Sequence, residues 1–235
     1  MTKALILGVL SLIILSIIIL NVYKRRKNQK LIKSVTSLNR GTNSELNLIL
    51  MLLKSGINSK SIFHDLIIKK ENNKFSQVDI VIATTQGIIV IEVKDYSGWI
   101  FGNGNQTNWT QVMAYGKRKY RFYNPIKQVK SQILSLKNSL KQFDKIPFFS
   151  IIVFFGDCSL KEINYVPEGT FIVKPHRIIE AINSIKANNE QAPYENKQEV
   201  IDTLKGAVLN GANKDYHQQH IENIRNIVGK HRILN

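Results

Sequence analysis

The 235-residue chain contains a single cysteine, Cys158, so it cannot form an intramolecular disulfide. The sequence also has no glycine-rich phosphate-binding loop, no nucleophile-elbow motif and no Cys/His pattern with the spacing of zinc ligands. Internal repeats and low-complexity tracts are absent. These absences leave no sequence support for a P-loop enzyme, a serine hydrolase or a zinc-binding domain. We expect Cys158, which ends an apolar strand after Gly156 and Asp157, to be a small buried residue.

Acidic residues are scarce relative to basic ones. The chain has 17 Asp and Glu against 33 Lys and Arg, which gives a formal net charge of +16. This imbalance indicates an anionic partner, either a nucleic acid or an anionic membrane leaflet. A basic run over 116–121 suits the backbone of a nucleic acid, although a solvated hairpin explains the run equally well on its own. The residues assigned to nucleic-acid binding are Lys117, Arg118, Lys119 and Arg121.

Only one apolar run is long. It covers residues 4–20, and Tyr23 and a basic cluster over 24–27 follow it directly. At about 1.5 Å per residue, a helix over 4–23 nearly crosses a hydrocarbon core, and basic residues accumulate on the cytoplasmic side of such a helix. We therefore expect a membrane anchor. A cleavable signal peptide is the alternative, but it would carry its basic residues before the apolar run.

The expected organisation has four parts: a transmembrane anchor over 1–23, a basic juxtamembrane stalk over 24–40, an α/β domain over 41–157, and a mostly helical α/β extension over 158–235. In this arrangement residues 24–235 lie in the cytoplasm. The basic residues within 24–33 are close enough to the membrane to contact anionic lipid.

The periodicity of the apolar residues predicts an α/β fold. Helices are expected over 42–56, 124–143, 176–185, 195–209 and 215–228, and strands over 61–68, 77–83, 87–94, 109–113, 119–123, 148–155 and 171–173, with a short strand within 96–105. The strand over 148–155 is apolar on both faces, which is typical of the centre of a sheet. The order of a helix, three strands, a helix and a strand favours a mixed central sheet flanked by helices.

The second and third strands form a predicted hairpin that carries Asp79, Glu92 and Lys94 on one face. If residues 85–86 form the turn, Asp79 lies opposite Glu92, and if residues 86–87 form it, Asp79 faces Lys94. Directly opposed side chains have Cβ atoms roughly 4.5–5.5 Å apart, so one small cation can bridge two opposed carboxylates. Two carboxylates against one lysine leave a negative excess that a divalent cation would balance. A same-face ion pair on an exposed strand is the alternative.

Two further polar residues have ordinary structural explanations. Glu45 stands three residues after Thr42 at the start of a predicted helix, where it completes a capping box, and it also borders the buried stripe of that helix. Gln128 lies one turn into the helix that begins after Asn124, with Pro125 at its first position. A surface glutamine is the default interpretation there.

Four sequence blocks resemble the nuclease-related domain family, often abbreviated NERD, which is placed in the PD-(D/E)xK restriction-endonuclease-like superfamily. The blocks are Gly41-Thr-Asn-Ser-Glu45, Val78-Asp79-Ile-Val-Ile, Gly87-Ile-Ile-Val-Ile-Glu-Val-Lys94 with Gly98 soon after, and Asn124-Pro-Ile-Lys-Gln128. They occur in the family's order and approximate spacing, and the resemblance covers about residues 41–155. It implies a restriction-endonuclease-like mixed central sheet flanked by helices, with the site on the central hairpin. The motif that names the superfamily has a proline before the aspartate, and this chain has Val78 at that position.

The resemblance also implies an activity. The residues that match the catalytic positions are Glu45, Asp79, Glu92, Lys94 and Gln128. Asp79 and Glu92 would hold Mg²⁺ or Mn²⁺, Lys94 would hold and help deprotonate a water, and the other two would orient water or phosphate. We expect a membrane-anchored, divalent-metal-dependent nuclease that cleaves DNA, and a homodimer is compatible with this function. A catalytically inactive, membrane-tethered nucleic-acid-binding module with the same fold is the alternative.

Overall fold

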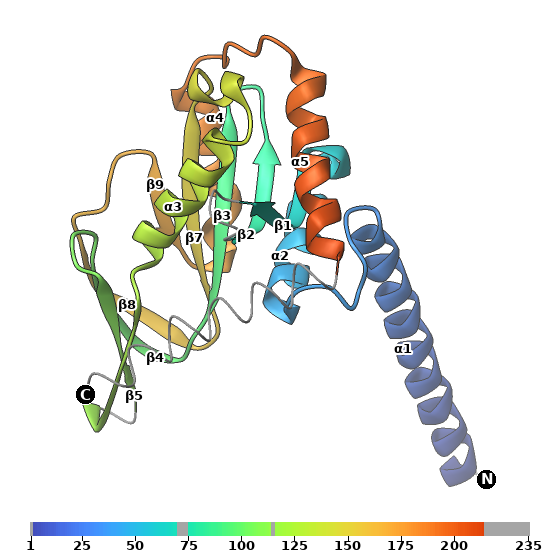
Figure 1. Cartoon of the computed structure of the whole chain (residues 1–235). Coiled ribbons are helices and arrows are strands. Elements are labelled where there is room, and N and C mark those ends of the chain that lie inside the picture. The colour runs from blue at the N-terminus through green and yellow to red at the C-terminus, as the bar shows by residue number, and fades with distance from the viewer. Residues whose placement is uncertain (1, 70–74, 114–115, 214–235) are drawn as a thin grey trace.

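The computed structural model describes residues 2–69, 75–113 and 116–213, and these residues form two mixed β-sheets flanked by helices (Figure 1). The first sheet has the order β1 (Ile62–Lys69), β2 (Phe75–Ala83), β3 (Ile88–Asp95), β7 (Phe148–Phe155) and β9 (Thr170–Val173). The second has the order β6 (Arg118–Tyr123), β5 (Asn108–Met113), β4 (Gly98–Asn103) and β8 (Cys158–Asn164). The α-helices are α1 (Thr2–Lys33), α2 (Asn43–Lys54), α3 (Pro125–Lys137), α4 (Ile178–Asn188) and α5 (Lys197–Ala212), and the short 3-10 helices are η1 (Ser59–Ser61), η4 (Lys141–Asp144) and η5 (Pro175–Arg177). The predicted α/β class is confirmed.

The second sheet was not predicted, and two glycines explain how it arises. Strands β3 and β7 run parallel in the first sheet, and the strands that follow them, β4 and β8, run parallel in the second. The chain turns from one sheet to the other at Gly98 (φ 76°) and Gly156 (φ 72°). A Cβ at either glycine would lie 2.3 Å from a backbone carbonyl oxygen, so these two turns require glycine.

Two apolar clusters pack on opposite faces of the first sheet. One contains α2 and α4 side chains such as Leu48 and Ile182, which pack against Ile80 and Ile91. The other contains side chains of α3, α5 and the second sheet, such as Val129, packed against the opposite face of the same strands. The first sheet is therefore covered on both faces, which agrees with the apolar character of β7.

Two local predictions were wrong. The helix predicted over 124–143 ends at Lys137, and η4 follows it. The Ser139 hydroxyl donates to the Leu136 carbonyl (2.6 Å), so a polar side chain competes with continued helix at this point. Cys158 begins β8 instead of ending the preceding strand, although it is buried as expected. The predicted helix over 215–228 lies outside the described residues.

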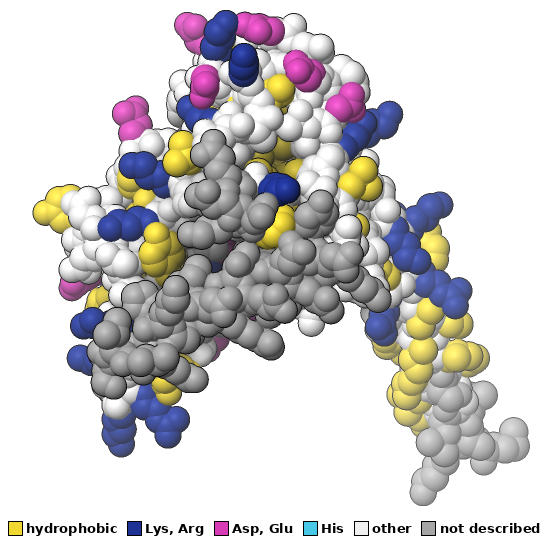
Figure 2. Space-filling view, in the orientation of Figure 1, with side chains coloured by type: hydrophobic (Ala, Val, Ile, Leu, Met, Phe, Trp, Pro, Cys, Tyr) yellow, Lys and Arg dark blue, Asp and Glu magenta, His cyan; other side chains and the backbone are white. Residues whose placement is uncertain are grey.

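The N-terminal segment forms the helix α1, which projects away from the sheets (Figure 1). In the described part of the chain, no helix combines the length and apolar character that crossing a membrane requires, so the expected anchor over 4–23 is not supported. At about 1.5 Å per residue, the apolar run over 4–20 gives about 26 Å of helix, short of a hydrocarbon core about 30 Å thick. Figure 2 shows apolar side chains along this helix and Lys and Arg side chains toward the end that precedes α2.

The start of α3 is fixed by the buried side chain of Asn124. Its Oδ1 accepts from the Ile126 N–H (2.9 Å), which caps the helix, and its Nδ2 donates to the carbonyls of Asn103, Gly104 and Gln106 at 2.7–3.1 Å. One side chain therefore satisfies a helix N-terminus and the loop between β4 and β5. Pro125 occupies the first helical position, where its missing N–H costs nothing.

We predict that Asn124→Ala lowers the free energy of unfolding by about 3 kcal/mol, because it removes a helix cap and leaves buried carbonyls without donors. Urea denaturation followed by circular dichroism measures this loss. Asn138→Ala, at the exposed C-terminal end of the same helix, is the matched control and should change the free energy by less than about 0.5 kcal/mol. Equal effects of the two substitutions would contradict the assigned role of Asn124.

Candidate functional site

The central hairpin adopts the register in which residues 85–86 form the turn, since Ile80 pairs with Ile91 and Ala83 with Ile88. The paired ladder ends at Ile80 and Ile91, so the two strands separate where Asp79 and Glu92 follow. In place of a backbone partner, the Val93 N–H donates to Asp79 Oδ2 (2.8 Å). The first of the two predicted registers is therefore confirmed up to Ile80 and Ile91, but Asp79 does not pair with Glu92 as that register predicted. The carboxylate of Asp79 instead caps the open end of the ladder.

An irregularity in the neighbouring strand accompanies this arrangement. Asp65 lies between two paired positions of the β1–β2 ladder and has a left-handed φ of 55°. Val78 and Val81 pack in the same apolar cluster, so the alternation of side chains along β2 is interrupted between them, at Asp79. The strained conformation is held because Arg40 donates to Asp65 Oδ2 (2.7 Å) and Gln77 donates to Asp65 Oδ1 (2.9 Å).

Glu92, Lys94 and two glutamines of α3 form one continuous polar chain. Lys94 Nζ lies 2.6 Å from Glu92 Oε1 and donates to Gln128 Oε1 at 2.9 Å. Gln132 Nε2 donates to Glu92 Oε2 (2.7 Å) and to the Gln77 carbonyl (2.9 Å). Glu92 is only 2% exposed, so its charge depends on these partners for stabilisation.

The pKa values of Asp79 and Lys94 are both raised, but for different reasons. The pKa of Asp79 is raised well above its ordinary value, first by burial and then by the negative charges of Glu92 and Glu45. Burial alone lowers the pKa of Lys94, but the charge and hydrogen bond of Glu92 outweigh burial and the net shift is upward. Lys94 is therefore held as an ammonium group beside a site with surplus negative charge.

Glu45 performs the structural task foreseen for it and also lies near the hairpin. Its Oε1 accepts from the Thr42 hydroxyl (2.7 Å) and N–H (3.2 Å), which completes the capping box of α2. Its Oε2 lies 2.9 Å from Nε2 of the buried His64, whose Nδ1 lies 2.9 Å from the Thr36 hydroxyl. Burial raises the pKa of Glu45, but the bonds from His64 and Thr42 more than offset it and the net pKa is lowered.

The sequence block before α2 begins with Gly41 because no other residue fits at this position. It has a φ of 75°, and a Cβ on it would lie 2.5 Å from Glu45 Oε2 and 2.6 Å from His64 Nε2. Any side chain at this position would therefore separate Glu45 from His64.

Comparison with known proteins gives a family for this arrangement. The nuclease-related domain matches residues 40–155, which contain both strands of the hairpin, α2 and α3. The chain carries a nuclease-related domain. It is also 26% identical over 183 residues to an uncharacterized protein from Bacillus anthracis, a match that covers 77% of this chain and 81% of that protein. No solved structure matches the chain significantly.

Within the nuclease-related domain, the residues predicted for the site fall into two groups. The hairpin and α3 bring Asp79, Glu92, Lys94 and Gln128 together, with Glu45 near enough for its charge to act on Asp79. The four predicted basic residues lie instead on or beside β6 of the second sheet, and their side chains do not share one face of it. Strand alternation places Lys119 and Arg121 on one face and Arg118 on the other, while Lys117 precedes the strand.

Two residues of the site were missed from the sequence. Gln132 stands four residues after Gln128, and this spacing places both glutamines on one face of α3, which is a signal that sequence reasoning could have used. The position of His64 in a strand gave no indication that it would hold Glu45, because the contact joins segments 19 residues apart.

The donor set fits a hard cation with few protein ligands. Among the described residues, no group of three or more His, Cys, Asp and Glu side chains is arranged to hold a metal ion. The site offers two carboxylates, those of Asp79 and Glu92, and magnesium commonly uses one or two carboxylates together with water and substrate phosphates. Burial raises the pKa of Asp79 most, and the negative charges of Glu92 and Glu45, which a cation would balance, raise it further.

We predict a pH-dependent effect of Asp79→Asn on stability in the absence of divalent metal. A carboxyl group whose folded pKa lies above its unfolded value of about 3.9 stabilises the fold below that value, and the stabilisation is lost as the pH rises through the folded pKa. The amide retains an acceptor for the Val93 N–H, so the variant should gain stability relative to the unsubstituted chain as the pH rises from about 4 to about 8. Urea midpoints at both pH values measure this difference.

Asp144→Asn, which makes the same change of charge at an exposed aspartate of η4, is the control. A difference between Asp79→Asn and the unsubstituted chain that stays constant over this pH range would contradict the assigned environment of Asp79.

Proposed function

We propose that this protein is a divalent-metal-dependent nuclease that hydrolyses the phosphodiester bonds of DNA. The observation that supports the proposal best is the convergence of one lysine and two carboxylates at the open end of the hairpin, with Lys94 Nζ 2.6 Å from Glu92. Asp79 and Glu92 would hold Mg²⁺ or Mn²⁺ there. When bound, the cation would polarise a phosphoryl oxygen and make a water molecule more acidic.

The surrounding residues have complementary tasks in this proposal. Lys94, kept as an ammonium by Glu92, would orient the attacking water and stabilise the extra negative charge of the transition state. Gln128 accepts from the Lys94 ammonium through its Oε1 and would contact the water or the phosphate through its amide N–H. Glu45, fixed by His64, would orient water beside Asp79. Gln132 positions Glu92.

One observation favours the alternative of an inactive nucleic-acid-binding module. Both oxygens of Glu92 already have donors, because Lys94 contacts Oε1 and Gln132 contacts Oε2. A carboxylate that is satisfied in this way is stable without a cation. The two functions differ in one measurable respect, since only the nuclease needs Glu92 for turnover.

The test uses the purified full-length chain with supercoiled plasmid and linear DNA in Mg²⁺, Mn²⁺ or EDTA. We predict cleavage with either cation, none in EDTA, and a loss on the order of 100-fold or more in rate for Glu92→Ala. Glu180→Ala, at an exposed glutamate of α4, is the matched control and should cleave normally. Binding of DNA without cleavage under every condition would favour the inactive module. Cleavage that survives in Glu92→Ala would point to a contaminating enzyme.

We further propose that residues 24–235 act in the cytoplasm, beside a membrane surface that α1 contacts. Support comes from the exposed apolar side chains of this helix, among them Leu12, Ile18 and Tyr23, and from the basic residues over 24–33 that follow. The full-length chain should sediment with the membrane fraction of cells that express it. Recovery of the whole chain in the supernatant would contradict this location.

We also propose a homodimer, which would bring together two sites to cut both strands of a duplex. Light scattering of the purified full-length chain tests it.

A further inference from the structure

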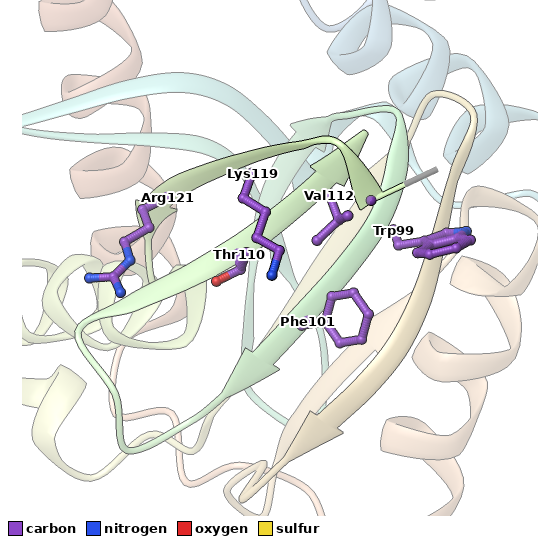
Figure 3. A pocket seen from close by; sticks show the side chains of 7 residues that line it. Trp99, Phe101, Thr110, Val112, Lys119 and Arg121 are labelled. Carbon is purple, nitrogen blue, oxygen red and sulfur yellow. The ribbon is translucent and has the colours of Figure 1, made fainter. Parts of the chain in front are cut away.

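The second sheet carries an open cleft of about 890 Å³ that the proposed chemistry does not use (Figure 3). It is lined by Trp99, Phe101, Thr110, Val112, Gly116, Lys119 and Arg121. The alternate residues of the same strands, such as Ile100 and Trp109, are buried in the apolar cluster beneath. The cleft therefore lies on the face of the sheet that turns away from the core.

Cross-strand pairing arranges the lining of this cleft in two parallel rows. Trp99 pairs with Val112, which pairs with Lys119. Phe101 pairs with Thr110, which pairs with Arg121. Each row runs from an aromatic ring on β4, across a small side chain on β5, to a cation on β6, as Figure 3 shows.

The cations of this surface have no acidic partners within the described part of the chain. None of Lys119, Arg121 and Lys161 forms a salt bridge there. Lys161 Nζ lies 5.5 Å from the centre of the Trp99 ring. Trp99 is 39% exposed, so part of a large aromatic ring is open to solvent beside the positive charge of Lys161. Flat aromatic rings bordered by unpaired cations suit a ligand that is both planar and anionic.

We propose that this surface, which we call the aromatic–basic platform (Trp99, Phe101, Lys119, Arg121 and Lys161), binds single-stranded DNA. Unpaired bases would stack on the two aromatic rings while the cations contact the phosphates. Single-stranded DNA is favoured over a duplex because the bases of a duplex are already stacked on one another and do not present their faces. The inference rests on the proposed nuclease function, and it names an unpaired segment, within or beside a duplex, as the form of DNA that the platform would hold next to the site.

The platform follows directly from the strand that carries the site. Trp99 stands five residues after Lys94, so their Cα atoms are at most about 17 Å apart on extended backbone. A smaller hollow of about 330 Å³ is lined by Trp99, by Asp157 and by Ser97 of the intervening turn. A short unpaired strand can therefore contact the platform and extend toward the site.

Tryptophan fluorescence gives a direct test. The chain has two tryptophans, and Trp109 is only 1% exposed, so a base that stacks in the cleft would quench Trp99. The full-length chain is titrated in EDTA with a single-stranded oligonucleotide of about 12 nucleotides, with a blunt duplex of the same length, and with RNA of the same sequence. We predict quenching by the single strand and at least roughly tenfold weaker binding of the duplex.

Substitutions separate stacking from charge. Trp99→Ala should weaken binding of the single strand roughly tenfold, whereas Trp99→Phe should retain affinity within about threefold and lose most of the quenching. Tyr120→Ala is the aromatic control, because Tyr120 is 48% exposed on the opposite face of β6 and should be silent. Arg121→Gln should weaken binding and reduce the slope of log K against log salt by about 1, and Lys186→Gln on α4 should do neither.

Some results would overturn the proposal whatever the outcome of the cleavage assay. These are unchanged binding by Trp99→Ala, equal binding of single strand and duplex, or loss of binding in Tyr120→Ala. Tighter binding of RNA than of DNA would overturn the assignment to DNA. If quenching and its loss in Trp99→Phe are observed but the chain never cleaves, the platform stands and the nuclease proposal fails.

Discussion

The cost of burying negative charge governs the centre of this protein. The paired ladder of the central hairpin stops just before Asp79 and Glu92, so the backbone no longer supplies every partner that these segments need. The carboxylate of Asp79 accepts a hydrogen bond from the Val93 N–H. Glu92 forms an ion pair with Lys94 and accepts a hydrogen bond from Gln132. Each of these contacts replaces hydration that burial removes, and the contact of Gln132 with Glu92 adds to the apolar packing that holds α3 against the hairpin.

The same cost explains the elements on the other side of the hairpin. Glu45 is held by the cap of α2 and by His64, and its charge in turn disfavours ionisation of Asp79. Asp65, in the strand next to Asp79, accepts from Arg40 in a strained conformation. A cluster with more carboxylates than cations is unfavourable without an added positive charge, and strain of this kind persists only where the surrounding structure holds it.

The sequence was sufficient to predict the fold class and the hairpin and to narrow the register of the hairpin to two possibilities, because strand alternation and turn length have few solutions. It also placed Glu92 and Lys94 on one face of the hairpin, whereas only the family resemblance pointed to Gln128, which contacts Lys94. It could not predict the second sheet, because the turns at Gly98 and Gly156 depend on backbone conformation and not on an apolar pattern. The long-range contacts of the site were missed for a related reason, since no periodicity links residues that meet only in the folded chain.

Asn124 connects helix α3, which packs on the first sheet, to strand β4 of the second sheet. Its side chain caps α3, which carries the glutamines that hold Lys94 and Glu92, and it donates to the carbonyl of Asn103 at the end of β4. The Trp109 indole N–H donates to the same carbonyl (3.1 Å). The strand that carries the aromatic rings of the platform and the helix that completes the site are thus fixed to one side chain. A strand of DNA held on the second sheet would meet a site whose position relative to that sheet is set by direct hydrogen bonds, as accurate positioning of a substrate requires.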